Sequence, residues 1–453
     1  MCKDIKNIVM RIFIALLVTC TFVVADQEKP CEETCEKEQS VVVTGIIPGS
    51  YAEDVGIREG DVIVTYNGVP VHCTNKLNAL KESLETDSVE IVVKRDDRVI
   101  SFVIPKGFIG VYIKEVVPDI DYDEDAVVIE GIGRLAWEAG ESNSFMGALS
   151  RIVEYLKIKK DYTFLMGTSG AAFRILFHEN WCPSSPDATV GFDCGTVALM
   201  SVGLQGEYLF YNKEAKNKQT MQKKILESID KRMPVIAIDL ITVAEWGLVV
   251  GYQKNGEELL VRTYFDKRKG YDIAEKFPWV VMTISQREGT IDDGENFKKS
   301  LRIAQELYET EKYEAYYSGI AALKYWINRL GEEDFGSLND ERYNDVMLAN
   351  AWIYERLGHD RKIGAAYLKS FVTEFPQIED DINALASIYE AEQRLIAEAG
   401  MIAPYPEQVQ EGSDWTAEMR NKQIEILTQV LEQENEVYSI IKKINKKIED
   451  SMP

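Results

Sequence analysis

The spacing of the glycines between residues 48 and 68 constrains the fold of this chain more than any other feature. The stretch reads PGSYAEDVGIREGDVIVTYNG. Gly49 follows a strand-like run, and Gly56 ends a short helical segment at a position where glycine tolerates a positive φ. Asn67-Gly68 is the strongest short signal of a β-hairpin. The segment therefore predicts a small domain made of short strands and tight turns.

Alternating and helical patterns extend this domain on both sides. Residues 41–47 read as a strand before the glycines. Leucines recur at helical spacing over 75–84, which predicts a second helix. Residues 89–93 and 99–104 read as two strands joined by a charged turn. The sequence therefore predicts a small β-sandwich with two helices over residues 38–113.

This order of elements, and above all the stretch 48–63, resembles PDZ domains, especially those of bacterial envelope proteases. The resemblance implies that an extended peptide binds beside a sheet edge, where backbone amides receive its terminal carboxylate. The implied partner is the C-terminus of a peptide or protein, and the alternative is a structural module whose groove is already occupied. The loop that would supply the amides consists of Phe108, Ile109, Gly110 and Val111.

The first 25 residues have the order of a secretory signal peptide. Lys3, Lys6 and Arg11 precede a largely apolar run over 12–24, and small residues end at Ala25. The run is short for a membrane-spanning helix, which needs about 20 apolar residues. We expect cleavage after Ala25 and export to the periplasm or the medium. The alternative is an uncleaved segment that anchors the protein, and it is the only membrane contact that the sequence predicts.

Charge and composition exclude several partners. The chain has 75 acidic and 51 basic residues and a net charge of −24, so it gains no counterion release on nucleic acid and should not bind it. Cys31 and Cys35, in the acidic segment 26–37, have no suitably spaced further ligands, so a disulfide or free thiols are expected. The acidic segment 114–125 lacks the spacing of a calcium loop. We therefore predict two linkers, no metal and no cofactor.

Residues 126–292 combine an early helix with late strands. A helix over 144–156 has an apolar stripe and a cap at Asn143 or Ser144. Residues 235–240 and 247–252 read as adjacent strands, and a third follows at 259–264. This layout predicts an α+β domain with an antiparallel sheet.

The helix from Ser144, the segment 166–174 and the late strands resemble the butirosin-biosynthesis-H-type N-terminal domain, a papain-like family of acyl-transferring and peptidase-related proteins. The resemblance implies a cysteine nucleophile at the helix start and a histidine base on a late strand. Here these positions fall on Ser144 and Glu245. We therefore expect an exported binding or scaffold protein whose papain-like domain lacks the usual dyad.

An enzyme remains the alternative, namely an amide hydrolase or acyltransferase that acts through Ser144, Cys194 or Cys182. Cys194 opens a helix-like stretch that resembles the cysteine helix of double-glycine leader peptidases. His178 lies four residues before Cys182 and could meet it. The simpler interpretations are a buried or disulfide-bonded Cys194 beside Cys182, and a loop histidine.

A polar pocket for a small molecule or peptide is a further possibility near Glu245. A glutamate of ordinary pKa, about 4.3, is a weak base at neutral pH, but burial would raise that pKa. The neighbouring side chains could equally form ion pairs inside a large domain. The candidate pocket residues are Arg174, Trp246, Arg262 and Asp266.

Residues 293–453 show helical periodicity and predict an all-α extension. Gly319 and the alanines after it allow a close approach of backbones, so we expect the extension to dock on the central domain. The complete prediction is a multidomain α+β protein: a PDZ-like β-sandwich, a papain-like α+β domain and a helical extension.

Overall fold

A computed structural model describes residues 39–47, 49–83, 85–106, 109–212, 217–241, 243–289, 292–406 and 415–450. They fall into two compact units, one up to Tyr122 with Phe265–Asp272, the other containing Asp123–Tyr264 and the chain from Ile273 onward. The predicted signal peptide, Cys31, Cys35 and Phe108 lie outside these ranges. Within them, no helix has both the length and the apolar character needed to span a membrane.

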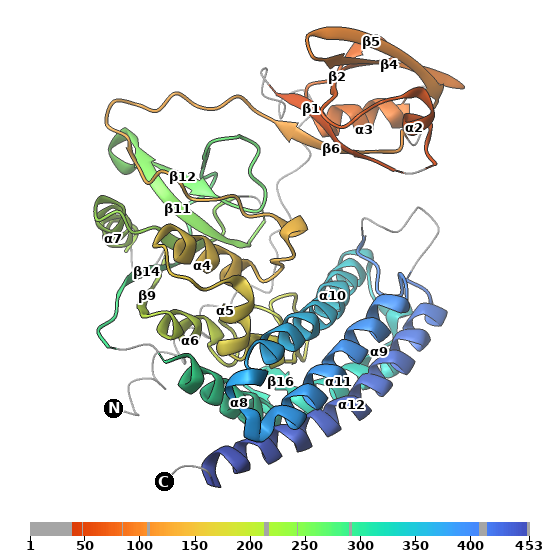
Figure 1. The fold of residues 1–453 in the computed structure, drawn as a ribbon. Coiled ribbons are helices and arrows are strands. Elements are labelled where there is room, and N and C mark those ends of the chain that lie inside the picture. The colour runs from red at the N-terminus through yellow and green to blue at the C-terminus, as the bar shows by residue number, and fades with distance from the viewer. Residues whose placement is uncertain are drawn as a thin grey trace. The chain divides into compact units, whose positions relative to one another are not determined.

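The first unit is a β module with two helices (Figure 1). The sheet order is β5-β4-β2-β1-β6, with antiparallel neighbours and with β3 paired to β2. The predicted strands and helices are present, but the last strand continues to residue 116, beyond the expected end at 113. The elements are β1 (Ser40–Ile46), α2 (Tyr51–Val55), β2 (Val62–Tyr66), β3 (Val69–Pro70), α3 (Thr74–Ser83), β4 (Ser88–Arg95), β5 (Arg98–Pro105) and β6 (Val111–Val116).

The glycine positions have the backbone geometry that the sequence predicts. Gly56 has a φ of 85° and ends α2, where its N–H donates to the carbonyls of that helix. Asn67 and Gly68 have φ values of 51° and 76°, and the type I′ hairpin turn requires positive values at both central residues.

Asp61, which follows Gly60, forms a buried ion pair with Arg95. Asp61 is fully buried and accepts hydrogen bonds from Arg95 Nε at 2.6 Å and Nη2 at 2.7 Å. The backbone N–H of Arg58 donates to the same carboxylate at 2.9 Å. Burial would raise the pKa of Asp61, but the bonds from Arg95 and Arg58 outweigh it and lower that pKa. The pair joins the end of β4 to the turn before β2.

The α+β part of the second unit contains a sheet of order β12-β11-β10-β14-β9, with β7 paired to β11. The predicted strands β10, β11 and β12 are antiparallel neighbours. Successive residues of β11 are buried because α4 and α7 both pack on it (Figure 1). The elements are β7 (Val127–Val128), η1 (Trp137–Ala139), α4 (Ser144–Tyr155), α5 (Tyr162–Thr168), η2 (Ala171–Phe173), β8 (Leu176–His178), α6 (Cys194–Ser201), β9 (Leu204–Phe210), α7 (Lys218–Asp230), β10 (Val235–Ile238), β11 (Trp246–Gln253), η3 (Lys254–Gly256), β12 (Glu258–Arg262), β13 (Asp272–Ile273) and β14 (Val280–Gln286).

The helical extension belongs to the same compact unit. Strand β16 pairs with β8, and the N–H of Gly319 donates to Ile175 O at 2.9 Å, which confirms the predicted docking. Helices α9 to α12 pack beside one another (Figure 1). The elements are α8 (Asp293–Glu309), β15 (Lys312–Tyr313), β16 (Tyr316–Ser318), α9 (Gly319–Glu332), η4 (Phe335–Ser337), α10 (Asp340–Ser370), η5 (Val372–Glu374), η6 (Pro376–Ile378), α11 (Glu379–Glu398) and α12 (Ala417–Asp450).

A buried charged cluster joins three of these helices to the central region. Arg361 of α10 donates to Glu392 of α11 at 3.0 Å and to Glu434 of α12 at 2.7 Å, and all three side chains are fully buried. Arg361 Nη1 also donates to Ala172 O in η2 at 2.9 Å. Burial, followed by the neighbouring Glu434, raises the pKa of Glu392 well above its ordinary value. The raised pKa favours the protonated form of Glu392 in this cluster.

Candidate functional site

The first candidate site is the region between the outer edge of β6 and helix α3, where the PDZ resemblance places the peptide groove. Strand β6 ends the sheet order, so its outer edge faces no further strand among the described elements. Helix α3 contacts β6. Thr74 at the start of α3 donates to Glu115 Oε1 through both its N–H and its hydroxyl, each at 2.6 Å. Val111 and Ile113 of β6 pack against the core of the module. One wall is therefore a strand edge and the other a helix.

The loop before β6 presents backbone N–H groups at the end of this groove. The carbonyl of Ile109 accepts from the N–H of Ala52 at 3.2 Å, and that of Gly110 accepts from the N–H of Ile47 at 2.9 Å. Because the carbonyl and the following N–H of a trans peptide point in opposite directions, the N–H groups of Gly110 and Val111 point away from α2 and β1. The N–H of Gly110 donates to none of the residues that the structure describes.

Only glycine fits at position 110. Its φ is +88°, a conformation that costs other residues about 1–2 kcal/mol. A Cβ atom there would also lie 2.1 Å from Ser50 Cβ, and the Ser50 hydroxyl donates to Gly110 O at 3.1 Å. The amide loop is therefore held in place by its packing against the start of α2.

The second candidate site brings together Ser144 and Glu245, which are 101 residues apart in sequence. Ser144 Oγ donates to Glu245 Oε2 at 2.5 Å, and the N–H of Trp246 approaches Ser144 Oγ at 3.4 Å. Ser144 begins α4, whose N-cap is Asn143, and Glu245 immediately precedes β11, on which α4 packs. The two positions that the resemblance assigns to nucleophile and base are therefore in direct contact.

The electrostatics of this pair follow from burial. Glu245 has its pKa raised to about 7, mainly by burial and also by Asp187, while the hydrogen bond from Ser144 and the charge of Arg356 act in the opposite direction. The expectation that burial would raise this pKa is confirmed. A pKa near the working pH suits a general acid or base. Ser144 itself is only 7% exposed.

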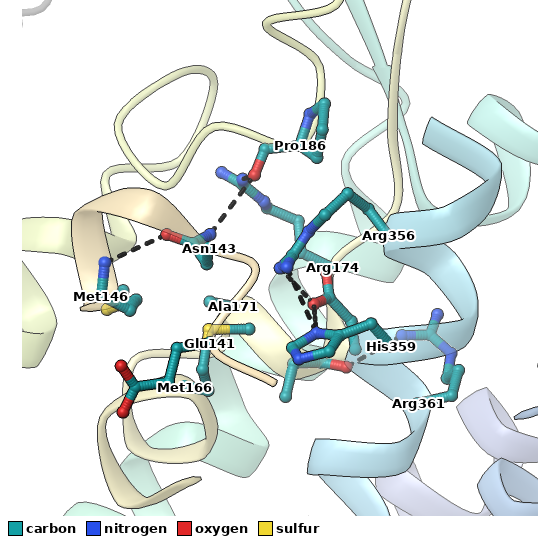
Figure 2. Close-up of polar contacts among 12 residues, drawn as sticks. Glu141, Asn143, Met146, Met166, Ala171, Arg174, Pro186, Arg356, His359 and Arg361 are labelled. Atoms are coloured by element: carbon teal, nitrogen blue, oxygen red, sulfur yellow. Dashed lines mark hydrogen bonds and ion pairs between the residues drawn. The ribbon is translucent and has the colours of Figure 1, made fainter. Parts of the chain in front are cut away.

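Arg174 and Trp246 hold one loop beside this pair. Arg174 donates to the carbonyls of Pro186 at 2.9 Å and Val190 at 3.0 Å, and Trp246 Nε1 donates to Asp187 Oδ2 at 2.7 Å. Figure 2 shows Asn143 between the first turn of α4 and Pro186. The buried guanidinium thus satisfies loop carbonyls and stabilises the loop.

The other two predicted pocket residues are Arg262 and Asp266. Arg262 Nη2 contacts Ile132 O at 3.4 Å, and Asp266 is buried and belongs to the first compact unit.

The predicted cysteines and histidine do not form a dyad. Cys182 and Cys194 are not joined by a disulfide bond, and both side chains are buried, so of the two simpler interpretations the buried cysteine is confirmed and the disulfide is wrong. Cys194 is buried at the start of α6, and burial raises its pKa to about 12, which keeps the thiol protonated. Cys182 Sγ contacts Ser184 Oγ at 2.9 Å, and His178 Nδ1 accepts from the N–H of Asn180 at 3.0 Å. Burial also lowers the pKa of His178.

Helix α10 supplies residues that the sequence did not place at this site. His359 Nε2 lies 2.6 Å from Gly140 O, in the loop that leads to Ser144, and its Nδ1 lies 3.2 Å from Arg356 Nη1. Figure 2 shows both side chains extending from α10 on the side of Asn143. The signal that could have found them is the run Arg356–Arg361, which brings two arginines, a histidine and an aspartate together within six residues of one helix.

A comparison with protein families matches residues 42–95 to the PDZ domain. These residues therefore form a PDZ domain, the class of module that commonly binds peptide C-termini. The solved structure of a PDZ domain protein from Parabacteroides distasonis ATCC 8503 is 12% identical and has a TM-score of 0.13. The match covers 61% of this chain and 59% of that chain, which is less than two thirds of its length. No curated protein matches the chain.

Proposed function

We propose that the protein is an exported binding or scaffold protein, in which the PDZ domain captures the C-terminus of an extended peptide. A peptide strand would add to the free edge of β6, and its carboxylate would accept hydrogen bonds from the N–H groups of Gly110 and Val111. The single observation that carries this proposal is the orientation of these N–H groups away from α2 and β1, beside the outer edge of β6. Each hydrogen bond to a charged group contributes about 1.5–3 kcal/mol.

Binding of matched peptides to the full-length protein tests this proposal. Peptides with a free C-terminal carboxylate should bind at least about tenfold more tightly than the same peptides with an amidated C-terminus, because amidation removes the charge that the N–H groups receive. Fluorescence anisotropy with labelled peptides measures the difference. Equal affinity for both forms would overturn the carboxylate mechanism.

A disulfide bond in the PDZ domain supports export. Cys73, next to the start of α3, is disulfide-bonded, and disulfides persist in oxidising compartments. Together with the signal-like N-terminus, this bond favours the periplasm or the medium. The intact mass of protein isolated from the cell envelope should correspond to a chain that begins at Asp26. A mass that retains Met1 would indicate a membrane anchor instead.

The central domain is, in this proposal, a papain-like pseudo-enzyme. Support comes from the contact of Ser144, at a helix start, with Glu245, before a late strand, where that family has its cysteine and histidine. The buried pair stabilises the junction of α4 and β11 and leaves little room for a substrate at Ser144. Serine- and thiol-directed activity probes should therefore label neither Ser144 nor the two buried cysteines.

A second candidate function is acyl transfer through Ser144, favoured by the 2.5 Å bond to a carboxyl group whose pKa is about 7. Ser144 Oγ would attack an acyl carbonyl while its proton passes to Glu245, which would then protonate the leaving group. Stoichiometric labelling of Ser144 that disappears in Glu245→Gln would support this function and overturn the pseudo-enzyme. Intact-protein mass spectrometry measures the labelling.

A further inference from the structure

Glu115 stands out among the groove residues because it is acidic on an otherwise apolar face. Across the β1–β6 pair, Glu115 lies opposite Val41 and Ile113 lies opposite Val43, both of which are core residues. Side chains alternate along a strand, so Val111, Ile113 and Glu115 share the face that looks toward α3. The contact of Glu115 with Thr74 confirms this direction.

One oxygen of Glu115 remains available. Both bonds from Thr74 reach Oε1, and Oε2 accepts no hydrogen bond and no ion pair from the rest of the described chain. The side chain is partly exposed. The groove therefore ends, at α3 Thr74, in an anionic oxygen with no cationic partner.

The geometry of strand addition determines which ligand residue meets Glu115. A peptide that adds antiparallel to β6, with its last residue opposite Val111, places the residue two positions earlier opposite Ile113. The residue four positions before the last then lies opposite Glu115, because opposite residues in an antiparallel pair advance together. Side chains of directly opposite residues lie about 5 Å apart and on the same face.

We propose that Glu115 makes this groove selective for peptides with Lys or Arg four residues before the C-terminal residue. This inference rests on the peptide capture proposed above. The cationic side chain would pair with Glu115 Oε2 while Thr74 keeps Oε1 in place. An acidic residue at the same position would meet a like charge and bind more weakly.

The test uses the full-length protein and six-residue peptides with free carboxylates that differ only in Lys, Gln or Glu at this position. Lys should bind about three- to tenfold more tightly than Gln, and Gln more tightly than Glu, with differences that shrink as salt rises. In Glu115→Gln, which keeps the Thr74 acceptor, the three peptides should bind alike. Four-residue peptides do not reach Glu115 and should bind the wild type and the variant equally.

Glu90→Gln is the matched control, since it removes the same charge from β4, where Glu90 accepts from Ser101 away from the groove. It should leave the order Lys, Gln, Glu unchanged. Equal binding of the three peptides to the wild type, with free carboxylates still preferred over amides, would overturn the role of Glu115 alone. Equal binding of free and amidated forms, or no binding of any peptide, would overturn the proposed function and this inference together.

Discussion

The two candidate sites differ in where their polar groups find partners. In the PDZ groove the available groups are backbone N–H groups and one oxygen of Glu115 at an open strand edge. At Ser144 and Glu245 the polar groups bond to each other, and residues of α10 contact the loop beside them. Buried polar groups must find partners inside the protein, whereas groups at an open edge can take a ligand. The first arrangement therefore suits binding, and the second suits stability.

The largest expected effect comes from breaking the cluster that joins the helical extension to the central region. Arg361→Met leaves the carboxyl groups of Glu392 and Glu434 buried without their cation, and should cost about 3–5 kcal/mol of unfolding free energy. Urea unfolding followed by tryptophan fluorescence measures the loss. If the second site is closed by α10, Ser144 should also gain reactivity toward serine probes.

The matched control is Glu392→Gln. Because burial and Glu434 raise the pKa of Glu392 well above its ordinary value, the protonated form of this carboxyl group is favoured, and glutamine resembles that form. We expect a change of less than about 1 kcal/mol. Equal losses in the two variants would contradict the charge assignment in the cluster.

The second largest effect is a pH-dependent contribution to stability that comes from Glu245 at the second candidate site. The folded-state pKa of Glu245, about 7, is above its ordinary value of 4.5, so the folded protein holds this proton more tightly than the unfolded chain does. The contribution of Glu245 to stability is therefore fully present below pH 4.5 and decreases as pH rises toward 7. Between pH 5 and pH 8 the loss should be about 2–3 kcal/mol.

Glu245→Gln should remove that part of the pH dependence, because glutamine does not titrate. Chemical unfolding at several pH values, with the variant beside the wild type, measures it. Identical pH profiles for the two proteins would mean that Glu245 is not held in a buried, partly protonated state.

A smaller loss of stability should be confined to the PDZ domain. Asp61→Asn weakens the bonds from Arg95 and should cost this domain about 2 kcal/mol. Because the pKa of Asp61 is lowered, this contribution is present above the ordinary pKa and is lost as pH falls through the folded-state value. Hydrogen exchange should show faster exchange in β2 and β4 and no change in the second unit. Faster hydrogen exchange in both units would contradict the expectation that the PDZ domain loses stability on its own.

The smallest effect concerns affinity. Gly110→Ala places a Cβ against Ser50 and forces a positive φ, so the amide loop must shift. Peptides with free carboxylates should bind about tenfold more weakly, while the unfolding of the second unit is unchanged. Unaltered affinity would show that these N–H groups do not receive the carboxylate.

The PDZ domain could be predicted from sequence patterns that extend over only a few residues. Gly56, the pair Asn67-Gly68 and the strand alternation each act over a few residues, so the strands and helices followed from the sequence. The expected end at residue 113 was too early, because β6 continues through Val116 and places Glu115 in the groove. The pairing of that residue with Thr74 depends on the packing of α3, which no local pattern contains.

In the second unit, the sequence and a family resemblance identified Ser144 and Glu245, and they located the strands that bring them together. They did not identify Arg356 and His359, because a helix that begins almost 200 residues after Ser144 reaches the site only through the packing of the extension.

The sequence by itself predicted the hairpin turn at Asn67-Gly68 and the strands and helices that show a clear periodicity, since backbone preference and side-chain periodicity are properties of neighbouring residues. Only the tertiary structure decided which polar groups remain free and which are enclosed. That outcome depends on burial and on contacts between segments far apart in the chain. Burial is the main cause that raises the pKa of Glu245 to about 7, whereas the outer edge of β6 pairs with no further strand among the described residues.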